Sequence, residues 1–83
     1  MVTLKNVTRT NNIFEYDYYP EWHKDELGHI KYDLDKEEII DVQYSKEDDV
    51  YFHGYAIKST RALKKMLKEN NNEILDEYVM MWY

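Results

Sequence analysis

The chain has 83 residues, no cysteine, 43% hydrophobic residues and a formal net charge of −6. A chain of this length builds one hydrophobic core, so a single domain over residues 1–83 is expected, folded without disulfides in the reducing cytoplasm. Its composition argues against a membrane protein, because no apolar run approaches ~20 residues, and against direct nucleic-acid binding, because acidity repels phosphates.

The first two expected elements are strands. Residues 2–7 form a short candidate strand at one edge of a sheet. From residue 12 to residue 19, polar and apolar positions alternate, with Phe14, Tyr16 and Tyr18 on one side. This period of two is typical of a half-buried strand, and a proline ends the run.

Two further strands are expected to form a hairpin. Residues 29–34 and residues 40–44 both alternate, and the pair Asp35 and Lys36 between them is typical of a turn. Two alternating runs joined by a short polar turn predict an antiparallel pair.

A helix is expected over residues 61–68, with Ser59 or Thr60 as its N-cap. Residues 50–57 fit either a strand or an earlier helix start near Gly54. Three consecutive asparagines at residues 70–72 are suited to the left-handed backbone that ends many helices. The apolar stripe of this helix consists of Ala62, Leu63, Met66 and Leu67.

The last six residues, 78–83, are apolar on both faces, which favours either a buried central strand or a strand covered by the helix and a partner, with Trp82 in the core. Together these elements predict an α+β fold of two layers. An antiparallel sheet of four or five strands is covered on one face by a helix from the C-terminal half, and a final strand follows.

The negative charge is concentrated in the middle of the chain. Residues 15–49 contain thirteen acidic residues and four lysines, a balance of −9, whereas residues 1–14 carry +2 and residues 50–83 carry +1. Such a region suits a basic protein partner.

No pattern for a metal, a cofactor or a nucleotide is present. His23, His29 and His53 lack a metal-ligand spacing, and the acidic run at residues 47–49 lacks the periodicity of a calcium loop. With two glycines, no phosphate loop or dinucleotide fingerprint can be written. Outward-facing carboxylates on neighbouring strands could in principle act as an acid and base pair, and the candidates are Glu15, Asp17, Asp33 and Asp41.

Aromatic residues are abundant, with nine tyrosines and two tryptophans. Phe14, Tyr16 and Tyr32 are expected in the core, because a small sheet needs large side chains to fill it. Tyrosine and tryptophan also concentrate at protein interfaces. The residues expected to contact a partner are Tyr19, Trp22, Asp33, Asp41, Asp49 and Tyr55.

These features predict a non-catalytic binding protein, monomeric or homodimeric, that engages a basic protein partner. Immunity proteins and nucleic-acid mimics are small acidic domains of this kind, an analogy of charge and size. Two alternatives stay open, namely a small metal-dependent or carboxylate-based hydrolase, and a homo-oligomeric structural domain that buries residues 78–83 across a two-fold axis. The composition, rich in Asn, Lys, Ile and Tyr, is similar to that of small proteins from AT-rich bacterial or phage genomes.

Overall fold

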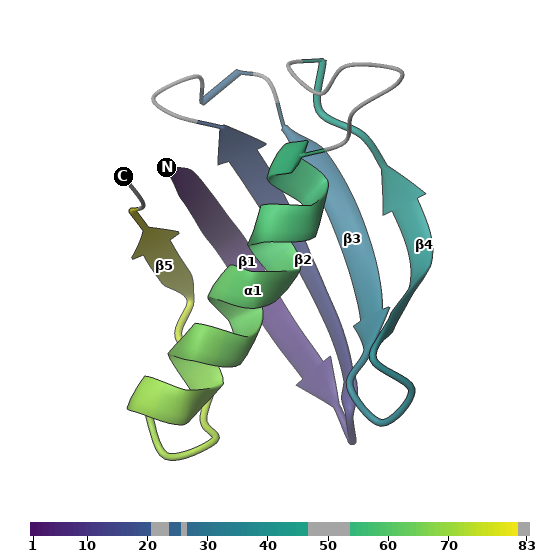
Figure 1. Ribbon diagram of the computed structural model, residues 1–83, viewed down its shortest axis with the longest axis vertical. Coiled ribbons are helices and arrows are strands. Elements are labelled where there is room, and N and C mark those ends of the chain that lie inside the picture. The colour runs from purple at the N-terminus through teal and green to yellow at the C-terminus, as the bar shows by residue number, and fades with distance from the viewer. Residues whose placement is uncertain (21–23, 26, 47–53, 82–83) are drawn as a thin grey trace.

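The computed structural model describes residues 1–20, 24–25, 27–46 and 54–81, and within these it shows a two-layer α+β fold (Figure 1). In chain order the elements are β1 (Val2–Thr10), β2 (Ile13–Pro20), β3 (Gly28–Asp33), β4 (Glu38–Gln43), α1 (Gly54–Glu69) and β5 (Glu77–Met80). Every neighbouring pair of strands is antiparallel, in the order β4-β3-β2-β1-β5. The expected fold class is therefore confirmed.

The core lies between α1 and one face of the sheet. Alternate residues of β2 and β3 point toward the helix, and Phe14, Tyr16 and Ile30 are fully buried there. From the helix, Met66 and Leu67 meet them at 0% and 5% exposure. The predicted core positions on these elements, including Tyr32 at 3% exposure, are confirmed. Trp82 lies outside the described residues.

The helix begins at Gly54 and not at the predicted N-cap, Ser59 or Thr60. Ser59 is fully buried within the helix, where its hydroxyl donates to the Ala56 carbonyl at 2.6 Å and lies 3.0 Å from the Tyr16 hydroxyl. An N-cap side chain instead accepts from the first free amides of a helix. Of the two readings of residues 50–57, the helical one holds for residues 54–57, and residues 50–53 are outside the described part.

Left-handed residues close the helix, as the asparagine run predicts. Asn71 and Asn72 have φ angles of 55° and 64°. The Asn72 amide donates to the Leu67 carbonyl at 2.7 Å, which satisfies one of the free carbonyls at the helix end.

Two strand positions differ from expectation. β1 is not an edge strand, because it pairs with β2 on one side and β5 on the other. β5 is not central, because it is the last strand in the sheet order. Only Tyr78 and Met80 of β5 pack against the core, whereas Val79 on the opposite side is 46% exposed. The part of the C-terminal run that lies in β5, residues 78–80, therefore belongs to an edge strand.

A bulge in β1 changes the direction of its side chains. The register with β2 shifts between Lys5 and Thr8, and Asn6 takes a φ of 54°. The extra residue lets Val7 enter the core at 4% exposure while Asn6 stays exposed.

Candidate functional site: the open face of the sheet

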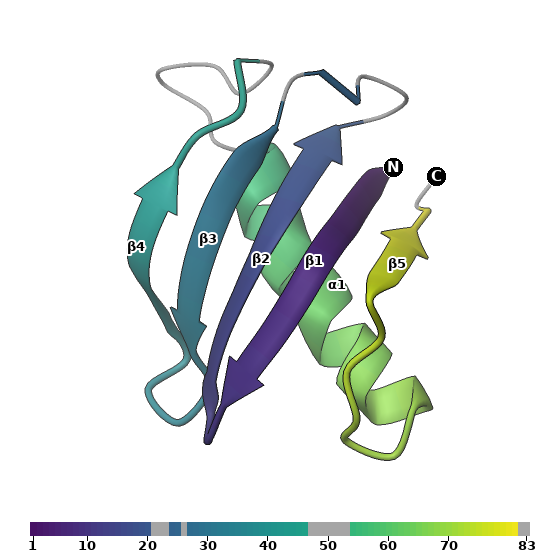
Figure 2. The same cartoon turned by 180° about the vertical axis from the view of Figure 1, so that it is seen from behind.

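The side of the sheet opposite α1, here called the open face, is not covered by any described helix or strand (Figure 2). Strand alternation places on this face the residues between the core positions, so it presents most of the polar side chains of β2 and β3. It is also where the sequence places its candidate carboxylates.

Cross-strand registers arrange these side chains in three rows. One row runs through Glu77, Lys5, Asp17, His29 and Gln43; the next through Thr8, Glu15, Lys31 and Asp41; the last through Thr10, Ile13, Asp33 and Glu38. The rows hold six carboxylates and two lysines. The open face is therefore acidic, although each lysine lies opposite a carboxylate on a neighbouring strand.

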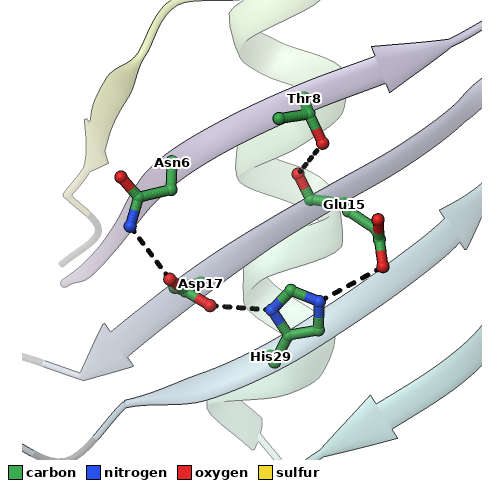
Figure 3. A network of polar contacts seen from close by, with 5 residues as sticks. All are labelled: Asn6, Thr8, Glu15, Asp17 and His29. Atoms are coloured by element: carbon green, nitrogen blue, oxygen red, sulfur yellow. Dashed lines mark hydrogen bonds and ion pairs between the residues drawn. The ribbon is translucent and has the colours of Figure 1, made fainter.

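A polar network occupies the centre of this face (Figure 3). The His29 ring lies between two carboxylates, with Nδ1 at 2.7 Å from Asp17 Oδ1 and Nε2 at 3.4 Å from Glu15 Oε1. The Asn6 side-chain amide donates to the other Asp17 oxygen at 3.0 Å, and the Thr8 hydroxyl donates to the Glu15 carbonyl at 3.5 Å. Three adjacent strands thus contribute to the network.

The network favours a charged histidine. The hydrogen bond to Asp17 raises the pKa of His29, and the carboxylate of Glu15 adds to this effect. Partial burial raises the pKa of Asp17, but hydrogen bonds from His29 and Asn6 outweigh it, and the resulting pKa lies below its ordinary value. The two carboxylates therefore stabilise the protonated form of His29.

In this arrangement the His29 ring is engaged at both of its nitrogens. Both ring nitrogens face carboxylates, so the ring has no free nitrogen with which to accept a proton from a substrate. Among the described residues, no group of three His, Cys, Asp or Glu side chains is placed to hold a metal ion. A hollow of about 300 Å³ lies at the start of α1, in the other layer, and its described lining is Gly54, Ile57, Lys58 and Arg61. It presents no carboxylate or imidazole from that lining.

A second group of carboxylates lies where β3 meets β4. Asp33 and Glu38 are direct cross-strand partners, and Asp41 follows on β4 after a bulge at Ile40. Like charges placed directly opposite each other in a sheet are destabilising. We call Asp33, Glu38 and Asp41 the acidic corner. Of the three, Asp33 accepts a hydrogen bond from the Lys36 amide at 3.2 Å, and no described residue forms an ion pair with Glu38 or Asp41.

The structure brings together only part of the predicted partner-contacting set. Asp33 and Asp41 both lie in the acidic corner. Tyr19 is on the open face but is 5% exposed, so it offers little surface to a partner. Tyr55 lies on α1 in the other layer, half-buried against the core. Trp22 and Asp49 are outside the described residues.

Two contributors were not foreseen in their structural roles. Glu38 becomes part of the site through its register with Asp33, which depends on a four-residue connection between the strands. Asn6 reaches Asp17 only because of the β1 bulge. The hairpin pattern in the sequence could have indicated that Glu38 pairs with β3. Nothing in the sequence pattern indicates the bulge in β1.

Comparisons of the chain with family models, with curated proteins and with solved structures give no match. Within the part of the chain that the structure describes, no helix is long and apolar enough to cross a membrane.

Proposed function

We propose that the chain is a non-catalytic binding protein whose acidic corner engages a basic protein, in the manner of a small inhibitor or immunity protein. The observation that carries this proposal is the Asp33 and Glu38 pair. Two carboxylates face each other across β3 and β4 at an open edge, and a lysine or arginine of a partner would relieve their repulsion.

The surroundings of the corner support the same role. No described helix or strand covers this face of the sheet, and the carboxylates of the neighbouring His29 network are already paired with the ring, whereas those of the corner have no described ion-pair partner. α1, which carries five cationic residues, lies in the layer behind the open face (Figures 1 and 2).

The test compares two glutamate reversals that change the net charge equally. Glu38→Lys alters the corner, and Glu73→Lys alters an exposed glutamate in the loop before β5. A basic protein captured by the wild-type chain should associate with the Glu38→Lys variant roughly two- to tenfold more slowly, and with the Glu73→Lys variant at close to the wild-type rate. Stopped-flow or surface-based kinetics measure both rates.

The dependence on salt gives a second readout. The association rate of the wild-type chain should fall as ionic strength rises. For Glu38→Lys, the association rate should depend less on ionic strength. Equal rates for both variants, or a captured partner with no basic surface, would show that the corner is not the binding site.

A further inference from the structure

The outer edge of β5 has the features of a strand that pairs with another strand. It is the last strand of the sheet, so the hydrogen-bonding groups along its outer side have no described strand beside them (Figure 2). Val79 and the following Met81 are 46% and 53% exposed, and Glu77 is the only charged residue of the strand. An exposed apolar edge of this kind is a template for strand addition.

The opposite edge of the sheet is protected. β4 carries Glu38 and Asp41 and is interrupted by a bulge at Ile40. Charges and bulges are the devices by which natural sheets prevent edge pairing. The two edges therefore differ in kind, although each exposes one apolar side chain to a similar degree, 45% for Ile40 and 46% for Val79.

We propose that β5 pairs with β5 of a second copy of this chain, antiparallel across a two-fold axis, to form one continuous sheet through the dimer. A two-fold axis normal to the sheet keeps each residue on its own face, so partners must be an even number of positions apart. Centring the pair on Val79 places Val79 opposite its own copy.

This register is self-complementary at the positions beside the axis. Tyr78 of one copy then lies opposite Met80 of the other on the helix side, where both side chains are half-buried in the monomer. Glu77 lies opposite Met81, so no two like charges face each other. A β-branched pair and an aromatic–methionine pair are both favourable cross-strand neighbours.

The distribution of charge suits a second copy at this edge. The acidic corner lies on β3 and β4, which are three and four places from β5 in the sheet order, so pairing at β5 leaves the two corners at the far ends of the dimer. Each chain carries −6, and added salt screens the remaining repulsion. Dimerisation should therefore hold or strengthen as salt rises, the opposite of what is expected for the partner at the acidic corner.

The test is the mass of the chain by analytical ultracentrifugation as its concentration rises. The wild-type chain should move from 10.2 kDa toward twice that mass. The Val79→Lys variant, which places two lysines opposite each other at the axis, should stay monomeric. The Ile40→Lys variant is the matched control on the other edge and should dimerise as the wild type does.

A mixture of two variants tests the register itself. Val79→Lys and Val79→Glu should each be monomeric alone and should form a heterodimer when mixed, because opposite charges then meet at the axis. Circular dichroism confirms that both variants remain folded. A wild-type chain that stays monomeric near 1 mM, on the order of the weakest specific affinities, overturns the proposal. So does a Val79→Lys variant that still dimerises, and a mixture that stays monomeric overturns the register.

Discussion

At the scale of single residues, His29 is the group on the open face whose charge is most sensitive to pH. Its ring bridges Asp17 and Glu15, and 42% of its side chain is exposed, so protons reach it freely. Loss of its proton would leave one ring nitrogen as a lone-pair acceptor facing a carboxylate, an arrangement that repels. The protonation of His29 therefore determines whether both ring nitrogens attract the carboxylates of Asp17 and Glu15 or one of them repels its neighbour.

We expect NMR titration to give His29 a pKa above the ~6.5 of an unperturbed histidine, and we expect Asp17→Asn to lower it. A raised pKa means that the native state binds the proton more tightly than the unfolded state does. The stabilisation from His29 is then fully present below the unfolded pKa and is lost as pH rises through the folded one.

Asp17 acts in the opposite direction. Its lowered pKa gives stability above its unfolded value that is lost as pH falls through the folded value. The network should thus contribute most between the pKa of Asp17 and that of unfolded histidine. A His29 pKa that does not change in the Asp17→Asn variant would contradict the bridging arrangement.

A second residue-scale feature is the buried hydroxyl pair between the layers. Ser59 donates its only hydroxyl proton to the Ala56 carbonyl, so the Tyr16 hydroxyl donates to Ser59 at 3.0 Å. Burial raises the pKa of Tyr16, although the hydrogen bond to Ser59 partly opposes this, so the phenol stays protonated. Helix and sheet are thus joined by a polar contact inside an apolar core.

Ser59→Ala should therefore destabilise the fold by about 1–3 kcal/mol, because it leaves a buried phenol without its partner. Thr60→Ala is the matched control, since Thr60 also donates to the carbonyl three residues back but lies on the exposed side. We expect it to change the free energy of unfolding by less than ~0.5 kcal/mol. Urea denaturation measures both, and equal effects would mean that the Tyr16 contact contributes nothing specific.

At the scale of elements, Gly28 determines how β3 packs beside β2. A Cβ atom at this position would lie against the Tyr18 ring and 2.7 Å from the Ser45 backbone nitrogen. That nitrogen donates to the Tyr18 hydroxyl at 3.0 Å, which ties the end of the β4 segment to β2. The start of β3 therefore requires a residue without a side chain.

Gly28→Ala should destabilise the chain by roughly 1–3 kcal/mol, the usual cost of overpacking a filled core. The comparison is Lys31→Ala on the open side of the same strand, which should change stability by less than ~0.5 kcal/mol. Thermal unfolding measures both variants. A neutral Gly28→Ala would show that Tyr18 and Ser45 can move apart without loss.

Most elements follow from the sequence because period-two alternation and the apolar helix stripe are local signals. The signal for the start of the helix is not local. Ser59 fits the sequence pattern of an N-cap, but in the structure its hydroxyl forms a hydrogen bond with Tyr16 across the two layers. The position of β5 is not local either. A run that is apolar on both faces indicates burial, yet pairing order alone decides that Val79 lies at an edge.

The candidate site was predictable as far as it depends on alternation. Asp33 and Asp41 occupy the open face as expected, because they fall between core positions of their strands. Tyr19 also falls on that face, but alternation carries no information on its burial. The pairing of Asp33 with Glu38 and the contact of Asn6 with Asp17 depend on register and on a bulge, which involve distant parts of the chain.

At the scale of the whole molecule, charge is divided between the two layers. The open face is acidic, whereas the outer side of α1 bears Lys58, Arg61, Lys64, Lys65 and Lys68. This separation raises the question of whether the helix could bind a nucleic acid despite the net charge of −6. The answer depends on how many of these cations are already paired with carboxylates.

Two of these cations already face carboxylates. Lys64 lies 3.1 Å from Glu37, a contact that raises the pKa of Lys64, and Lys65 lies 3.9 Å from Glu69. Among the described contacts, no carboxylate pairs with Arg61 or Lys68. Two cations available for phosphates predict a log–log slope on the order of −2 for the salt dependence of any binding to duplex DNA. We expect such binding only at low salt and none measurable at physiological salt, by fluorescence anisotropy of a labelled duplex.

Glu37→Gln, which releases Lys64, should make the log–log slope of DNA binding against salt steeper by about one. Micromolar binding at physiological salt with a slope near −6 would mean that the helix is a nucleic-acid surface and that the acidic face is not the principal site of interaction.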